Sequence, residues 1–164
     1  MIRLIVAIDQ RRGVATDDGI PWRLPEDAAY FRSQTTSGVV VMGSATYRKF
    51  AEPLHDRDNF VLTTHQHPLR DGFRPIAMLD DAIRSSPGED IWVIGGAFVF
   101  AATLEQADEL FLTQVLADFN CTKFFPEYAG SFSRFDSSPG HEDGGVAFRF
   151  EKWRRPSGHR STGV

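Results

Sequence analysis

Short apolar runs that alternate with segments of helical length constrain the fold of this chain more than any other feature of its sequence. Such alternation is typical of βαβ units, in which a helix connects two parallel strands. The last two apolar runs have no helix between them, so we expect an antiparallel pairing at one edge. The sequence therefore predicts an α/β fold, with a mainly parallel central sheet, an antiparallel C-terminal edge strand and flanking helices. Strands are expected at residues 2–8, 39–42, 60–63, 91–94, 109–116 and 146–153, and helices at 25–35, 44–50, 79–85 and 97–104.

Length and composition predict one folded domain. The chain has 164 residues, of which 41% are hydrophobic and 24% charged, and a chain of this size can bury a core without disulfides. We expect the domain to span residues 1–154 and a polar tail to cover 155–164. A formal net charge of −4 argues against a basic face for nucleic acid, and the apolar start of the chain is too short for a membrane span. We expect a monomer that binds neither nucleic acid nor membrane.

Residues that commonly bind metals are few and scattered. Cys121 is the only cysteine, and the five histidines form no pair at a metalloenzyme spacing. A single cysteine leaves no disulfide framework and suits a reducing compartment. We therefore expect a cytoplasmic protein without a metal.

Three strand ends are followed by unusual loops. A long loop at 9–24 follows the first strand, and Gly43 and the pair Gly95-Gly96 each lead from a strand into a helix. Ligands of open α/β sheets bind beyond the carboxyl ends of the strands, and a helix N-terminus can hold a phosphate. The two glycine-marked helix starts could thus hold a pyrophosphate. The alternative is that these glycines only supply tight turns, because neither loop has a dinucleotide or P-loop fingerprint.

Asp27 is the strongest candidate for chemistry in the sequence. On the helix predicted at 25–35, Asp27 shares a face with Phe31 and Thr35, because these residues are four apart. A carboxylate buried beside an aromatic ring is costly without a partner, which would point to a functional role. By position alone, however, the sequence favours the alternative, an exposed acid in the first turn that stabilises the helix dipole by about 0.3 to 1 kcal/mol.

Motifs along almost the whole chain point to one known family. In these motifs and their order, the sequence resembles the dihydrofolate reductases, and the blocks PWRLPED and VIGGA are the most specific. The matching stretches are LIVAI at Leu4, IPWRLPEDAAYF at Ile20, VVVMGSATY at Val39, PLHDRDNFVLT at Pro53, WVIGGA at Trp92, ELFLTQV at Glu109, FFPEY at Phe124 and FRFEKW at Phe148.

The resemblance implies NADPH-dependent reduction of 7,8-dihydrofolate to 5,6,7,8-tetrahydrofolate, which supplies one-carbon metabolism and thymidylate synthesis. Hydride would pass from the nicotinamide to C6 of the pterin, and solvent would deliver a proton to N5. In this scheme Asp27 binds the pterin and favours its protonated form, Thr113 supports the same end of the ring, and Trp22 orients a water. Antifolates such as methotrexate or trimethoprim are implied as ligands.

The resemblance also implies which residues line the two binding sites, with Arg57 pairing with the glutamate carboxylate of the substrate and a cis bond between Gly95 and Gly96. For the folate pocket the implied residues are Ile5, Ala28, Phe31, Phe50, Leu54, Arg57 and Ile94. For NADPH they are Ala7, Val14, Ile20, Gly43, Ser44, Ala45, Thr46, Thr63, Thr64, His65, Gly95, Gly96, Ala97, Phe98 and Val99.

Some positions depart from the family pattern. Ser44 and Ala45 stand where an arginine commonly meets the 2′-phosphate of the cofactor, which predicts a narrower preference for NADPH over NADH. Ala15 stands for a usual glycine and would restrict the loop at 9–24 if its backbone needs positive φ. Thr122-Lys123 replaces an acid-threonine pair, which predicts the loss of an anchor for that loop.

Two other functions remain open at this point. A pyrimidine reductase of riboflavin biosynthesis would have a related fold but would not need the PWRLPED block. A module that binds a pterin or dinucleotide without turnover would not need Asp27. Oxidation of the nicotinamide on addition of dihydrofolate separates the reductase from the module.

Overall fold

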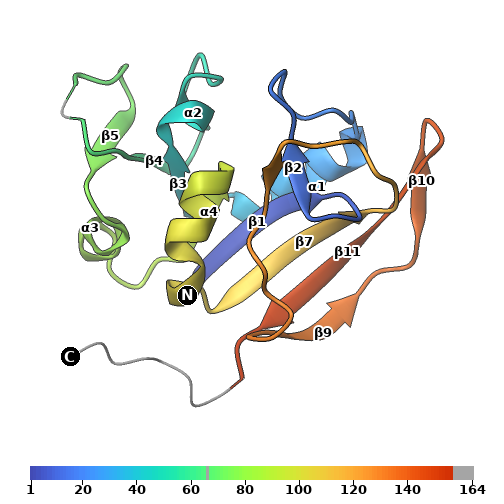
Figure 1. Ribbon diagram of the computed structural model, residues 1–164. Helices are drawn as coiled ribbons and strands as arrows, with labels where there is room; N and C mark the ends of the chain where they lie inside the picture. The colour runs from blue at the N-terminus through green and yellow to red at the C-terminus, as the bar shows by residue number, and fades with distance from the viewer. Residues whose placement is uncertain (66, 157–164) are drawn as a thin grey trace.

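The computed structural model describes residues 1–65 and 67–156 and is built around one large sheet with helices on both faces (Figure 1). The strands are β1 (Ile2–Ile8), β2 (Gly13–Ala15), β3 (Val39–Gly43), β4 (Asp58–Leu62), β5 (Phe73–Ile76), β6 (Ile91–Gly95), β7 (Glu109–Val115), β8 (Lys123–Phe124), β9 (Ser133–Ser137), β10 (His141–Asp143) and β11 (Val146–Arg154). The helices are α1 (Pro25–Thr35), α2 (Ser44–Tyr47), α3 (Leu79–Ser85) and α4 (Ala97–Thr103), followed by the 3-10 turn η1 (Leu104–Gln106).

The central strand of the sheet is the first strand of the chain. Neighbouring strands follow the order β10-β11-β7-β1-β6-β3-β4-β5, with β9 also paired to β11. All pairs from β7 to β5 are parallel, whereas β11 runs antiparallel to β7. The predicted α/β fold is confirmed. The antiparallel edge is wider than the single strand predicted, because β9 and β10 add to the outer side of β11.

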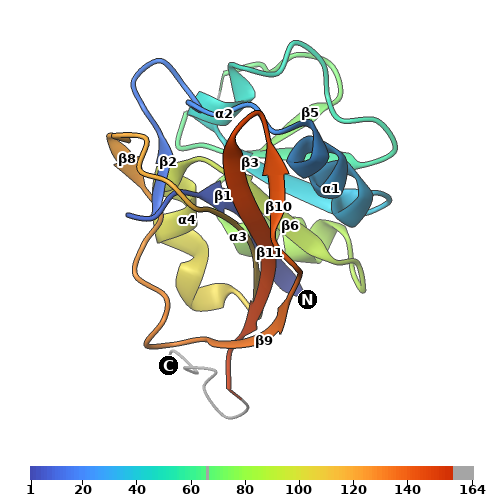
Figure 2. The same cartoon turned by 90° about the vertical axis from the view of Figure 1, so that its right-hand side faces the viewer.

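The parallel strands bury side chains on both faces of the sheet. Val39 and Val41 of β3 belong to the cluster that also contains Leu79 of α3 and Val99 of α4. Val40 lies in a second cluster, against which Phe31 and Tyr30 of α1 pack. Figure 2 shows α1 and α4 on opposite faces of the sheet. This alternation follows from the period of two along a strand, and it decides which side chains can meet α1.

The helix α1 has the bounds that the sequence predicted, with Pro25 in its first turn followed by Glu26 and Asp27. The start of a helix tolerates proline, because the first N–H groups have no partner within the helix. The helix α2 is shorter than predicted and ends at Tyr47. Beyond it, the N–H groups of Lys49 and Phe50 donate to carbonyls three residues back, so the chain turns more tightly than an α-helix.

Five short strands were not predicted, and each lacks a usual sequence signal. In β5, Pro75 argues against a strand, but β5 lies at the end of the sheet order, where proline is tolerated. All five residues of β9 are exposed, so this strand shows no apolar alternation. The strands β2, β8 and β10 have two or three residues each. These five segments therefore form strands because they pair with neighbouring segments, and not because of a pattern in their own sequence.

Arg155, which the sequence assigned to the tail, is held by the domain. Its side chain donates to the carbonyls of Ala107 (3.1 Å) and Leu104 (2.7 Å), and its backbone N–H donates to the carbonyl of Asp108 (3.1 Å). Residues 157–164 of the predicted tail lie outside the described residues. Within residues 1–65 and 67–156, no helix is long and apolar enough to cross a membrane.

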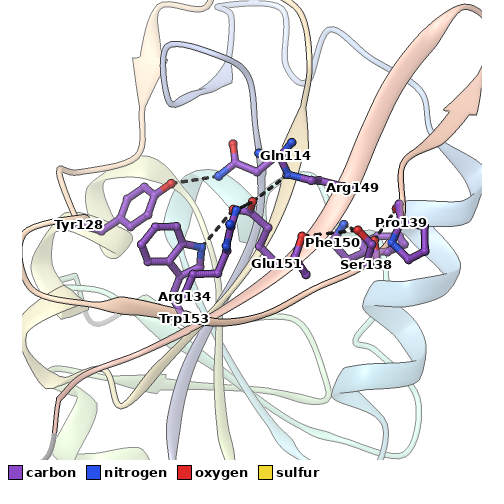
Figure 3. Close-up of polar contacts among 10 residues, drawn as sticks. Gln114, Tyr128, Arg134, Ser138, Pro139, Arg149, Phe150, Glu151 and Trp153 are labelled. Atoms are coloured by element: carbon purple, nitrogen blue, oxygen red, sulfur yellow. Dashed lines mark hydrogen bonds and ion pairs between the residues drawn. The ribbon is translucent and has the colours of Figure 1, made fainter.

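Glu151 of β11 is a buried carboxylate that ties β9 to the sheet (Figure 3). It accepts hydrogen bonds from the side chains of Arg149 (2.8 Å), Trp153 (3.1 Å) and Arg134 of β9 (2.9 Å). Burial alone raises the pKa of Glu151, but these three donors outweigh it and hold the pKa below its ordinary value. Glu151 is thus ionised at neutral pH and stabilises the fold in that form.

We expect Glu151→Gln to lower the free energy of unfolding at pH 7 by about 2 kcal/mol, since hydrogen bonds to charged groups contribute about 1.5 to 3 kcal/mol. Because the pKa is lowered in the folded state, this stabilisation is present above the ordinary pKa and is lost as the pH falls through the folded value. Urea unfolding of both proteins from pH 7 to pH 3 should therefore show curves that converge in acid. Glu127→Gln, which removes an exposed partner of Arg12, is the control and should cost less than about 1 kcal/mol. A constant difference across the pH range would contradict the expectation.

Candidate active site

The centre of the candidate site is a hydrogen bond between α1 and β7. The hydroxyl of Thr113 donates to Oδ1 of Asp27 at 2.6 Å. Thr113 is 2% exposed, and it lies in register with Ala7 of β1 on the face of the sheet that α1 covers. The sequence placed both residues in the site, and the structure brings them together across 86 positions of the chain.

Asp27 has little hydrogen-bonding support for its charge. Burial raises the pKa of this carboxyl group, and the hydrogen bond from Thr113 lowers it by less, so the pKa lies above its ordinary value. The interpretation of Asp27 as a merely exposed acid of the first turn is therefore wrong. A partly buried carboxylate with a perturbed pKa beside a hydroxyl is typical of a site that binds or protonates a ligand.

Apolar residues predicted for the folate pocket gather beside Asp27. Their side chains pack against the cluster built on Val40, Trp92 and Phe111, on the α1 face of the sheet. Ala28, also predicted, is exposed on α1. Those in the cluster are Ile5, Phe31, Phe50, Leu54 and Ile94.

Arg57 lies at the other end of α1 and is firmly held. Its guanidinium donates to the carbonyls of Thr35 (2.9 Å), His55 (2.8 Å) and Arg32 (3.0 Å). Two of these carbonyls belong to the last turn of α1, where a cation is favourable. Arg57 and Leu54 also line a surface hollow of about 560 Å³. A fourth, longer bond of 3.5 Å runs to the hydroxyl of Thr36. Since guanidinium has five N–H donors, these contacts leave one donor for an anion.

The glycine-marked helix starts lie against each other. A Cβ at Gly43 would come within 2.5 Å of Val99, and one at Gly95 would come within 3.3 Å of the hydroxyl of Thr46. Gly95 has φ of +130°, which side-chain-bearing residues rarely adopt, and the bond between Gly95 and Gly96 is cis as predicted. Only glycine fits this junction of β3 and β6 with α2 and α4. The buried side chain of Val99 closes the junction from the core side.

The other residues predicted for the cofactor differ in exposure. Thr63 follows β4, and its hydroxyl accepts from the N–H of His65 at 3.1 Å. The rings of His65 and His67 stack with centroids 5.9 Å apart. Phe98 is 85% exposed and Ile20 is 64% exposed. Ser44, Ala45, Thr64 and Ala97 are partly or fully exposed.

The loop at 9–24 is anchored, contrary to the expectation from Thr122-Lys123. The hydroxyl of Thr122 donates to Asp17 at 3.0 Å, and its N–H donates to the carbonyl of Ala15 at 2.9 Å. The predicted loss of an anchor is wrong, because Thr122 itself donates two hydrogen bonds to the loop. Ala15 and Val14 are buried in β2, where the backbone is extended, so Ala15 is not strained.

Trp22, near the end of the same loop, is buried. It is 8% exposed and packs edge-on against Phe119, with ring centroids 5.3 Å apart. Sequence reasoning missed Phe119 and also Asp9, a buried carboxylate at the end of β1. The pattern Asp-x-x-x-Gly at 9–13 is the signal that could have found it, since aspartate commonly accepts from nearby backbone N–H groups in turns.

Known proteins similar to this chain agree with one another. A family model described as dihydrofolate reductase matches residues 1–155. The chain is 33% identical to the dihydrofolate reductase of Bacillus subtilis (strain 168), over 84% of this chain and 83% of that protein. It is 34% identical to the dihydrofolate reductase of Haemophilus influenzae, over 76% and 78%. The solved structure of dihydrofolate reductase from Enterococcus faecalis, complexed with NADP(H) and RAB-propyl, superposes with a TM-score of 0.86 at 25% identity, covering 95% and 96% of the two chains.

We expect Thr113→Val to raise the pKa of Asp27 further, because the variant removes the one hydrogen bond that lowers it. The carboxyl carbon of Asp27, followed by NMR from pH 3 to pH 9, reports this pKa directly. Thr103→Val is the control, since it removes a buried hydroxyl that donates to a backbone carbonyl of α4 instead. An unchanged or lower pKa in Thr113→Val would show that the hydroxyl does not stabilise the ionised form.

Proposed function

Because the chain belongs to the dihydrofolate reductase family and reduces 7,8-dihydrofolate to 5,6,7,8-tetrahydrofolate with NADPH, we propose that Asp27 is the residue on which turnover depends. The observation that carries the proposal is the partly buried carboxylate of Asp27, to which, among residues 1–65 and 67–156, the hydroxyl of Thr113 alone is seen to donate. A pterin offers two parallel donors, a ring N–H and an amino group, that match the two oxygens of a carboxylate. Substrate binding would supply the hydrogen bonds that the protein leaves out.

Asp27 acts on the proton rather than on the hydride. NADPH, when bound, supplies the hydride that reduces C6 of the pterin. A proton must reach N5, and solvent delivers it while the negative charge of Asp27 favours the protonated pterin. Thr113 holds the carboxylate in place, and Trp22 orients water near the ring. The loop at 9–24 excludes bulk water from the site.

The apolar residues beside Asp27 bind the rest of the substrate. Phe31, Leu54 and Ile94 belong to one cluster and present a continuous apolar wall for the pterin and benzoyl rings. Arg57, fixed by the end of α1, pairs with the glutamate carboxylate. Methotrexate and trimethoprim bind the same pocket through Asp27, and the protein acts as a monomer in the cytoplasm.

The junction of Gly43, Gly95 and Gly96 fits the cofactor. A side chain at Gly43 would meet Val99 and one at Gly95 would meet Thr46, so only glycine lets the two strand ends approach the helix starts this closely. Backbone N–H groups at the starts of α2 and α4, with the hydroxyls of Ser44 and Thr46, hold the phosphates. Thr63, Thr64 and His65 meet the 2′-phosphate, where neither Ser44 nor Ala45 supplies a charge.

The two alternative functions are less well supported. A pyrimidine reductase would have no need for the PWRLPED block that carries Asp27, and a binding module would have no need for the acid at all. The family model and the relatives named above favour the reductase over both.

We predict that Asp27→Ser lowers turnover at pH 7 by about 100-fold or more while the fold is kept, as expected for a lost protonation aid. Activity should partly return as the pH falls, because substrate protonated in solution no longer needs the carboxylate. The measurement is kcat for dihydrofolate between pH 5 and pH 8. Glu26→Gln, which removes the adjacent carboxylate that pairs with His141, is the matched control and should keep its activity. Wild-type turnover in Asp27→Ser at pH 7 would remove Asp27 from the mechanism.

We also predict a narrow preference for NADPH over NADH, because the hydroxyls of Ser44, Thr63 and Thr64 offer the 2′-phosphate neutral donors. Ser44→Arg should widen the preference, since guanidinium binds phosphate through two charged hydrogen bonds. His65→Ala should narrow it further. The measurement is kcat/KM for each cofactor. If the preference is wide and insensitive to both substitutions, another residue binds the 2′-phosphate.

A further inference from the structure

Asp9 is a buried carboxylate that the mechanism above does not use. Only 1% of the residue is exposed, and it lies directly after β1 at the start of the loop at 9–24. Its Oδ1 accepts the backbone N–H groups of Arg11 (2.9 Å) and Gly13 (2.7 Å). Its Oδ2 accepts the N–H of Phe119 at 3.1 Å, which belongs to the loop that follows β7. One side chain therefore joins two loops that are 110 positions apart in the chain.

The two loops meet closely at Asp9. A Cβ at Gly13 would lie 2.4 Å from Cβ of Cys121 and 2.8 Å from Oδ1 of Asp9. Only glycine at position 13 allows Asp9 and Cys121 to approach this closely. Burial alone raises the pKa of Asp9, but the backbone donors outweigh it and hold the pKa below its ordinary value. The carboxylate is therefore charged at neutral pH.

Phe119 connects the contact between the two loops to the candidate active site. Its ring packs edge-on against Trp22 at 5.3 Å, and both residues share an apolar cluster with Ala7 and Cys121. Trp22 depends on such packing for its position, because aromatic rings are located by the side chains around them. The hydrogen bond to Oδ2 of Asp9 fixes the position of the backbone of Phe119, and the ring of Phe119 packs against Trp22 and fixes its position.

We propose that Asp9 is a positioning residue of this enzyme, which sets the place of Trp22 through Phe119. The proposal rests on the role given to Trp22 above. It separates the two oxygens by function: Oδ1 shapes the turn at residues 9–13, and Oδ2 holds Phe119. Other bonds between the loops, from Gln10 to Ala117 and from Thr122 to Ala15, keep them docked when the Oδ2 bond is lost.

Asp9→Asn tests the Oδ2 bond alone. The asparagine oxygen can keep the bonds to Arg11 and Gly13, while its NH2 group faces the N–H of Phe119 and cannot accept from it. We expect kcat to fall about fivefold or more with KM for dihydrofolate changed less than twofold, since a small misplacement can cost up to about 100-fold in rate. Asp81→Asn is the matched control, because Asp81 also accepts two backbone N–H groups, at the start of α3, far from the site. It should lose stability without this loss of kcat.

A double-mutant cycle tests the route through Phe119. In a Phe119→Leu background, Asp9→Asn should change kcat by less than twofold, because the ring that transmits the effect is gone. An undiminished effect in that background would overturn the proposal, as would equal losses of kcat in Asp9→Asn and Asp81→Asn.

A spectroscopic readout keeps the proposal separate from the proposed function. With Trp92→Phe and Trp153→Phe, the emission reports Trp22 alone, and Asp9→Asn should shift it toward longer wavelength as the ring loosens and meets water. An unshifted emission contradicts the positioning role even if the enzyme is active. A parent that does not oxidise NADPH with dihydrofolate contradicts the proposed function, and the emission still tests Asp9.

Discussion

The strands from β7 to β5 run parallel with helices over both faces, so every side chain along them must point to one core or the other. This constraint decides what can meet α1. Along β7, Phe111 and Thr113 share the α1 face, and their neighbour Leu112 belongs to the opposite core. A shift of one residue in the register of β7 would move Thr113 away from Asp27 and bury a leucine against the carboxylate. The chemistry of the site thus depends on the pairing of β1 with β7.

The buried carboxylate of Asp9 and the partly buried carboxylate of Asp27 receive opposite hydrogen-bonding support from the protein. Asp9 receives three backbone N–H groups, and its pKa is lowered. Asp27 receives one hydroxyl, and its pKa is raised. A buried charge that lacks donors is costly to the fold. That cost is recovered where a ligand supplies the missing donors. The contrast therefore indicates that Asp9 stabilises the structure and that Asp27 binds the substrate.

The sequence predicted the elements with regular patterns and missed those without them. The bounds of β1 and α1 were predicted to the residue, because an unbroken apolar run and a helix start with proline and acids are strong local signals. The strands β5 and β9 could not be predicted, since they depend on neighbours rather than on their own side chains. The pairing of Asp27 with Thr113 followed from family motifs alone. The bond between Asp17 and Thr122 reversed an expectation, because the absence of a family motif does not show which other residues Thr122 can bind.

The central place of β1 also sets when the protein can fold during its own synthesis. The strand is complete at Ile8, but its neighbours β6 and β7 end at Gly95 and Val115. At about 5 to 20 residues per second, a ribosome needs roughly 5 to 20 seconds to make the chain between these points. Until β6 is complete, the apolar β1 has no strand to pair with on either side, and until β7 is complete it has one. The first strand to be made therefore waits long for its partners, and it is the segment that a chaperone at the ribosome would have to shield.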